Sequence, residues 1–300
     1  QGRYREALEV LHSAGNNQPD HPQAIALRND LNAAFRSLFL DGLADGMQPI
    51  QAVGLFYDFQ DLTPLGADGD QMVRNLVRRL VDVDLLDQAA KLLKYQVDNR
   101  LDGVPKAQVA TDLAWIYLMN KQPENALQAI NDTRTTILPP ALNAERRLAT
   151  ARAYMDLGRY DAALELVETD NSRDSQDIRA EIAWKQRTWP AAAALYEKSL
   201  GDRWKGQGAL AVGEEARLLR AGVAYSLADD DAGLARLRQR YSGFVEGSSN
   251  PAGLRVALSG MNVESLSSAD FGRVTADNEA FSGWVAKMKD RFRAARPAGT

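Results

Sequence analysis

The chain has 300 residues, no cysteine and a formal net charge of −4 at pH 7. The missing cysteines exclude disulfides, thiolate metal sites and a cysteine nucleophile. The acidic balance, with a pI near 5.4, argues against a nucleic-acid-binding protein, which would need a basic face. Charged residues make up 25% and aromatic residues 7%, and Ala and Leu are abundant, so helices are favoured over strands.

Residues 1–66 are expected to form an N-terminal helical region. Apolar residues recur at helical spacing over three stretches, Gln1–Leu11, Gln23–Leu43 and Pro49–Gln60. The aromatic residues Phe56, Tyr57 and Phe59 predict a core cluster, with an extra docking element as the alternative. Asp61–Asp70 contains a proline and two glycines but no apolar period, so a loop is expected there.

The clearest pattern in the chain is a two-helix unit at Gln108–Leu138. Its first helix carries an apolar stripe of Leu113, Ala114, Tyr117 and Leu118, and its second carries Ala126, Leu127 and Ile130. Pro123 between the stripes suits the first turn of a helix. Two amphipathic helices joined by so short a turn are expected to pack antiparallel, with the alanines allowing close approach.

The unit recurs over residues 67–200, where copies align on the alanines of their second helices, Ala89, Ala126, Ala163 and Ala192. These alanines are 37, 37 and 29 residues apart, and one copy contains Gly158-x-Tyr160-x-x-Ala163. The pattern resembles the tetratricopeptide repeat, a helix pair of about 34 residues. The resemblance implies an all-α fold: a right-handed α-α superhelix, or solenoid, of antiparallel helix pairs.

The same motif occurs at the start of the chain as Gly2-x-Tyr4-x-x-Ala7. It matches a second helix whose first helix is missing, and half a repeat would expose an apolar face. We therefore expect the chain to be the terminal part of a larger, bacterial-looking protein, with any targeting segment upstream. The absence of cysteine fits a bacterial cytoplasm or envelope, and the periplasm or envelope is the expected compartment.

Residues 201–300 are expected to hold a degenerate fifth pair, a loop and a capping helix. The pair is Ala216–Leu227 and Gly233–Tyr241, with Gly222 in the small position of its first helix. Gly243–Ser268 is rich in Gly, Ser and Asn, which predicts a long loop with one short helical piece. Ala269–Ala295 then closes the chain as a helix.

Catalytic and metal-binding patterns are missing from the sequence. The two histidines, His12 and His21, have no Asp or Glu cluster at ligand spacing, and the Asp runs lack the pattern of a calcium loop. Neither a Gly-x-Ser-x-Gly elbow nor a phosphate loop occurs. We expect neither enzyme activity nor a cofactor. An α-helical glycan-active enzyme with paired carboxylates stays an alternative.

The concave face that the resemblance implies is the first candidate site, and it would bind another protein or a peptide. In this family the first helix of each pair lines that face. The inward positions chosen as partner-binding residues are Arg74, Arg78, Thr111, Trp115, Arg152 and Trp184. Arginines near tryptophans could bind carboxylates and an apolar anchor. In the alternative, the tryptophans pack between repeats and the arginines are solvated.

The last helix is the second candidate site. Phe281, Trp284, Val285, Met288 and Phe292 share one face. The further membrane- or partner-binding candidates are its basic residues, Lys287, Lys289, Arg291 and Arg293. A basic amphipathic helix can lie on an anionic membrane, which would make the chain a membrane-surface adaptor. The favoured role is a cap over the last repeat.

Overall fold

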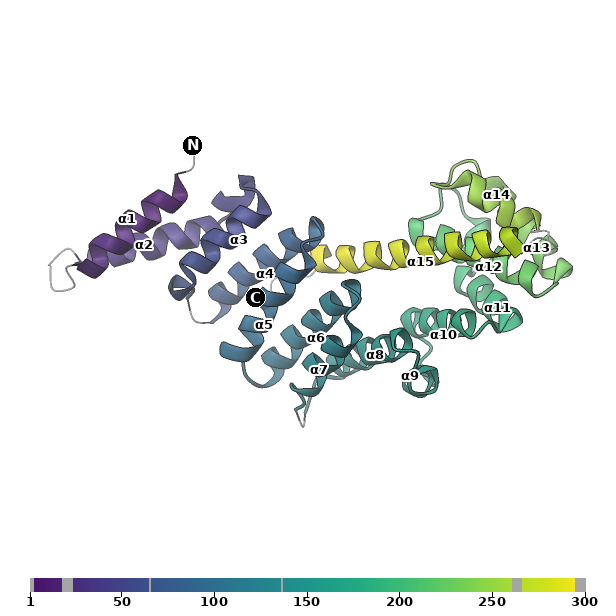
Figure 1. The fold of residues 1–300 in the computed structure, drawn as a ribbon, viewed down its shortest axis with the longest axis horizontal. Coiled ribbons are helices and arrows are strands. Elements are labelled where there is room, and N and C mark those ends of the chain that lie inside the picture. The colour runs from purple at the N-terminus through teal and green to yellow at the C-terminus, as the bar shows by residue number, and fades with distance from the viewer. Residues whose placement is uncertain (1–2, 18–23, 65, 136, 261–265, 295–300) are drawn as a thin grey trace. The chain divides into compact units, whose positions relative to one another are not determined.

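A computed structural model describes residues 3–17, 24–64, 66–135, 137–260 and 266–294 (Figure 1). Every regular element of these residues is a helix, and successive helices pack on their neighbours, which confirms the all-α class. Over the same ranges, no helix is both long and apolar enough to span a bilayer. The chain divides into two units. The first consists of Gln1–Asn120, Asn131–Ile137 and Phe292–Thr300, and the second of Lys121–Ile130 and Leu138–Arg291.

The first unit contains six α-helices: α1 (Tyr4–Asn17), α2 (Ala24–Phe39), α3 (Pro49–Asp58), α4 (Ala67–Asp82), α5 (Leu86–Asn99) and α6 (Gly103–Met119). Short 3-10 turns lie at Leu43–Gly46 and Gln60–Leu62. The rings of Phe35, Phe39 and Phe56 pack together with centroids 4.9 to 5.7 Å apart. Phe56 and Phe59 are buried, as the predicted core cluster requires.

The loop predicted at Asp61–Asp70 is wrong in its second half, because α4 begins at Ala67. Asp68 and Asp70 lie in the first turn of α4, where the positive end of the helix dipole favours carboxylates. Gly69 packs against the carbonyl of Pro64 so closely that a Cβ would clash. The acids and the glycine that suggested a loop are therefore the start of a helix.

The second unit contains α8 (Pro140–Asp156), α9 (Tyr160–Val167), α10 (Arg173–Lys185), α11 (Trp189–Leu200), α12 (Val212–Leu227), α13 (Asp231–Tyr241) and α14 (Pro251–Ser259). It also contains α7 (Pro123–Asn131) and α15 (Leu266–Ala294), except for their last residues, Asn131 and 292–294, which belong to the first unit. Further 3-10 turns lie at Arg203–Lys205 and Ser242–Phe244. Helix α14 is the short helical piece expected in the loop, and it packs on α12 and α13. Gly222 of α12 permits this packing, because a Cβ there would come 2.6 Å from the carbonyl oxygen of Ala257.

One turn geometry recurs between the two helices of every repeat copy. The residue two positions after the first helix adopts a positive φ at Asp84 (61°), Lys121 (55°), Gly158 (74°), Arg187 (59°) and Asp229 (52°). In the α8–α9 turn, the N–H of Arg159 donates to the carbonyl of Tyr154 and that of Gly158 to Met155. These are the two bonds of a Schellman motif, which satisfies the last carbonyls of a helix.

The repeat register follows from these turns. The aligned alanines each lie five residues after the positive-φ position, and Ala89, Ala126, Ala163 and Ala192 are completely buried. Their N–H groups donate to the residue four positions earlier, in the first turn of the second helix. Leu234, which is 5% exposed, takes the same place in the degenerate fifth copy. The fifth copy therefore keeps the backbone of the unit although its alanine is lost.

Candidate functional site

Two arginines lie on α4, the first helix of its pair, and amide side chains hold both. Arg74 donates to Oε1 of Gln71 at 3.0 and 3.3 Å, and Arg78 donates to Oδ1 of Asn75 at 2.7 Å. Gln71 in turn donates to Asn75 at 2.7 Å. Asn75 is tied to the carbonyl of Phe39 at 3.3 Å. Neutral groups thus fix both guanidinium groups in place.

Among the described residues, this arginine pair is hydrogen-bonded only to neutral groups. Burial lowers the pKa of Arg74, and the charges of Asp70 and Asp112 oppose this shift. Within the described ranges, neither Arg74 nor Arg78 forms an ion pair with a carboxylate. An arginine stays protonated at neutral pH and can bind a carboxylate with two parallel hydrogen bonds. The pair can therefore accept an acidic group from outside the first unit.

The other two predicted residues of the first unit are packing residues. Thr111 is fully buried, and its hydroxyl donates to the carbonyl of Ala107 at 2.7 Å. Trp115 is 5% exposed. Both lie on α6, and neither offers much surface to a partner.

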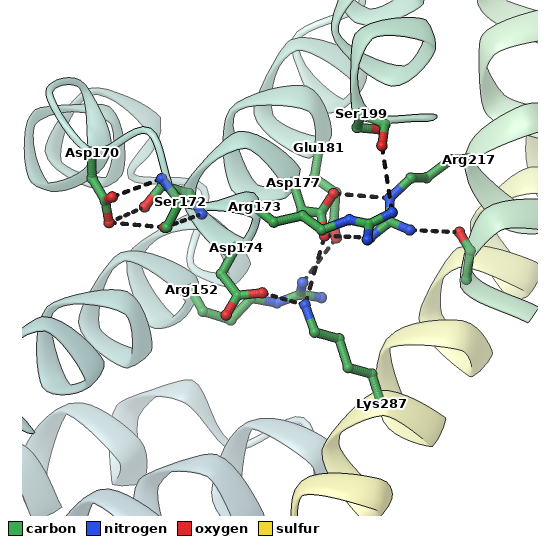
Figure 2. Close-up of polar contacts among 12 residues, drawn as sticks. Arg152, Asp170, Ser172, Arg173, Asp174, Asp177, Glu181, Ser199, Arg217 and Lys287 are labelled. Atoms are coloured by element: carbon green, nitrogen blue, oxygen red, sulfur yellow. Dashed lines mark hydrogen bonds and ion pairs between the residues drawn. The ribbon is translucent and has the colours of Figure 1, made fainter. Parts of the chain in front are cut away.

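In the second unit, the first helices α8, α10 and α12 are joined by ion pairs (Figure 2). Arg152 of α8 contacts Glu181 of α10 at 2.9 Å and, within its own helix, Asp156 at 3.5 Å. The Arg152 side chain is only 7% exposed. Arg152, predicted to bind a partner, thus forms a salt bridge with another residue of its own unit.

Asp156 and Glu181 respond differently to Arg152. Burial raises the pKa of Asp156, and the nearby charge of Arg152 opposes the rise only in part. Burial acts the same way on Glu181, but the charges of Arg152 and Arg220 outweigh it and lower the pKa of this carboxyl. Glu181 is therefore the better-stabilised anion of the two.

A second pair links α10 to α12. Asp177 accepts two hydrogen bonds from Arg217, at 2.6 and 3.0 Å, and this bonding raises the pKa of Arg217 against the effect of burial. The start of α10 is fixed by Asp170, which accepts from both Ser172 and Ser175. These hydrogen bonds, led by that from Ser175, lower the pKa of Asp170.

The C-terminal helix α15 contacts this row of first helices. Its Trp284 ring lies 4.2 Å from the guanidinium carbon of Arg152, a cation–π contact. Lys287 forms an ion pair with Asp174 and approaches Asp177 at 3.8 Å (Figure 2). Arg291 pairs with Glu145 of α8. Three of the predicted α15 residues therefore contact the protein's own first helices.

Trp184 and Arg220 bind α15 at a second place. The indole Nε1 of Trp184 donates to Asp277 at 2.8 Å, and Arg220 of α12 donates to the same carboxylate oxygen at 2.9 Å. The guanidinium carbon of Arg220 also lies 5.0 Å from the Trp184 ring. Trp184 is 2% exposed. One carboxylate of α15 thus satisfies two buried donors of the repeats.

Two predicted residues of α15 remain, Lys289 and Arg293. Arg293 belongs to the first unit and pairs with Asp82 of α4 at 2.8 Å, and Lys289 is half-buried. Sequence reasoning missed Arg217, Arg220 and Asp277 as contact residues. Asp277 precedes Trp284 by two helical turns on the same face, and this spacing could have identified it as a contact residue. The positions of Arg217 and Arg220 differ from the inward positions chosen in the other copies.

The described residues contain no group of three or more His, Asp or Glu side chains that could hold a metal ion. His12 packs edge-on against Phe59, and His21 lies outside the described residues. No family model matches the chain, and no solved structure matches it.

Proposed function

We propose that the chain is a non-catalytic protein-interaction scaffold, built as a right-handed superhelix of tetratricopeptide-like helix pairs. Another protein or a peptide binds to the face formed by the first helices of the pairs. Two features support this architecture: the positive-φ turn that recurs in every copy and, in four of the five copies, a buried alanine five residues after it. Stacked pairs of this kind present extended surfaces to partners.

The observation that carries the proposal is the difference between the arginines on the first helices. Arg152, Arg217 and Arg220 each have a carboxylate partner inside the second unit. Arg74 and Arg78 in the first unit are hydrogen-bonded only to amide side chains. Guanidinium groups fixed in this way lose little side-chain freedom when a carboxylate binds. The expected ligand of the first unit is therefore an acidic segment of a partner protein.

Reversing the charge of this pair tests the proposal. A photo-crosslinking residue is introduced on α4 of the natural protein in its own cells, with and without Arg74→Glu/Arg78→Glu. The control is Lys91→Glu/Lys94→Glu, which makes the same charge change on α5, the second helix of the same pair. We expect the crosslinked partner to disappear with the arginine variant and to persist with the lysine variant, while circular dichroism shows both variants folded. Equal crosslinking by both variants would contradict the proposal.

The alternative of a membrane-surface adaptor requires the same residues of α15 to face lipid. Trp284, Lys287 and Arg291 already contact Arg152, Asp174 and Glu145. Membrane binding would use the same side chains as these contacts, so α15 cannot make both at once. We therefore prefer packing of α15 on the first helices to membrane binding as its role.

A further inference from the structure

The contact residues of α15 form a stripe with heptad spacing. Asp277, Trp284 and Arg291 are seven residues apart, so they lie on one side of the helix almost two turns from each other. Lys287 lies between the last two on the same side. In order along α15, the stripe therefore presents a carboxylate, an aromatic ring and two cations.

The first helices of the second unit present the complementary order. Asp277 meets the donors of Trp184 and Arg220, and Trp284 meets the flat face of Arg152. Further along α15, Lys287 and Arg291 meet the carboxylates of Asp174 and Glu145. We call the surface made by Glu145, Arg152, Asp174, Trp184 and Arg220 the second-unit groove.

The groove is fixed more firmly than the helix that occupies it. Arg152 and Arg220 are 7% and 6% exposed, and groups within the repeats hold both: Glu181 for Arg152 and the Tyr196 hydroxyl for Arg220. On α15, by contrast, Asp277 is 51% and Lys287 42% exposed. In the Lys287–Asp174 pair both partners are about half-exposed, and ion pairs of this kind contribute little net stability. At Gly283, α15 approaches α12 closely, and a Cβ there would lie 3.7 Å from the Cβ of Ala216.

We propose that the second-unit groove is a helix-binding site and that α15 is its resident, exchangeable occupant. The partner is an amphipathic helix of another protein with the same order of groups: a carboxylate, an aromatic ring seven residues later and a cation ten residues later. This inference rests on the proposed function and specifies the partner of one unit. Because α15 competes for the groove, the partner binds more weakly than its contacts alone would allow.

A disulfide can hold α15 in place without touching the charged residues. A Cβ built on Gly283 lies 3.7 Å from the Cβ of Ala216, within the range that disulfides span. The chain contains no cysteine, so Ala216→Cys/Gly283→Cys can form one intramolecular bond and no other. The oxidised variant locks α15 into the groove, and the reduced form of the same molecule is its control.

The probe is a fluorescein-labelled peptide with the sequence of residues 266–294, titrated against the full 300-residue chain. We expect binding to the reduced double-cysteine variant and none to the oxidised form. A chain carrying Trp284→Ala holds its own helix less tightly, so it should bind the peptide roughly tenfold more strongly. The peptide carrying Trp284→Ala should bind at least tenfold more weakly than the parent peptide to each form of the chain that binds the parent peptide.

Hydrogen exchange of the amides of residues 280–291 supplies a second readout that needs no peptide. If α15 leaves the groove, these amides exchange faster in the reduced than in the oxidised variant. Equal peptide binding to both forms would place the peptide elsewhere and overturn the proposal. So would the absence of both peptide binding and faster exchange, because α15 would then be a permanent cap. Neither result affects the crosslinking test on α4, so the two proposals fail separately.

Discussion

Arg152 lies between two carboxylates whose pKa values move in opposite directions. The folded protein lowers the pKa of Glu181 and raises that of Asp156. A lowered pKa means that ionised Glu181 stabilises the fold above its unfolded pKa, and that this contribution is lost as the pH falls through the folded value. The raised pKa of Asp156 has the opposite effect on stability. Its ionisation lowers the free energy of unfolding at neutral pH, and this cost disappears on acidification.

Glu181→Gln and Asp156→Asn separate these contributions. We expect Glu181→Gln to lower the free energy of unfolding at pH 7 by about 1–3 kcal/mol, because Arg152 loses its stronger partner. Asp156→Asn should leave the stability at pH 7 unchanged or raise it. The difference for Glu181→Gln should shrink as the pH falls below about 4.5, where the unfolded carboxyl becomes protonated. The difference for Asp156→Asn should shrink as the pH falls through the raised pKa of Asp156 toward its unfolded value.

Thermal melts of the parent and both variants between pH 3 and pH 8 measure this directly. The parent is the common reference, and each variant changes one oxygen into an amide nitrogen. A larger loss for Asp156→Asn than for Glu181→Gln at pH 7 would reverse the assignment of the stabilising anion.

At the scale of the elements, the turn between the two helices of each pair has one residue with a positive φ. Only the α8–α9 turn has glycine at its positive-φ position, and the other four have Asp, Lys or Arg there. A left-handed conformation costs a residue with a Cβ about 1–2 kcal/mol relative to glycine. The turn is kept in spite of this cost because it directs the second helix back along the first.

Two substitutions test that argument with opposite signs. Gly158→Ala should lower the free energy of unfolding by about 1–2 kcal/mol, since φ there is 74°. Arg187→Gly should raise the free energy of unfolding by up to about 1 kcal/mol. The substitution removes the strain of a side chain at φ 59°, and this gain exceeds the cost of the extra entropy that glycine gives the unfolded chain. Urea unfolding followed by circular dichroism gives both values. If Gly158→Ala unfolds like the parent, the turn does not control this pair.

The sequence predicted the elements whose pattern is local. Helical periodicity placed the pairs, and the second-helix alanines gave the repeat register, because a small residue is needed wherever two helices approach closely. The start of α4 was missed because Asp and Gly favour both loops and helix N-termini.

The docking of α15 depends on partners distant in the chain and was beyond such patterns. Trp184 and Asp277 are 93 residues apart in sequence. Neither residue differs locally from an ordinary packing tryptophan or a solvated aspartate. Amphipathicity showed that α15 has a binding face, but only the positions of α8, α10 and α12 show which side chains it contacts.

At the scale of the whole molecule, the chain forms two units, and the division falls inside the repeat region rather than at its ends. In repeat proteins stability comes from each repeat and its contacts with neighbours, so distant segments can open separately. The two units therefore need not unfold together, although they share one type of helix pair.

Burying a charge at the repeat alanine of one unit tests this independence. Ala89 in α5 of the first unit and Ala163 in α9 of the second unit are both completely buried and occupy equivalent positions. An unpaired carboxylate at either site costs several kcal/mol, so Ala89→Glu and Ala163→Glu should each destabilise the helices around it. Hydrogen exchange read by mass spectrometry should show lost protection in α4 and α5 for Ala89→Glu, and in α8 to α10 for Ala163→Glu.

Each variant serves as the control for the other, because the same substitution is made at the same place in the repeat. Loss of protection along the whole chain in both variants would mean that the two units unfold as one, and full protection in either would mean that the repeat register is wrong.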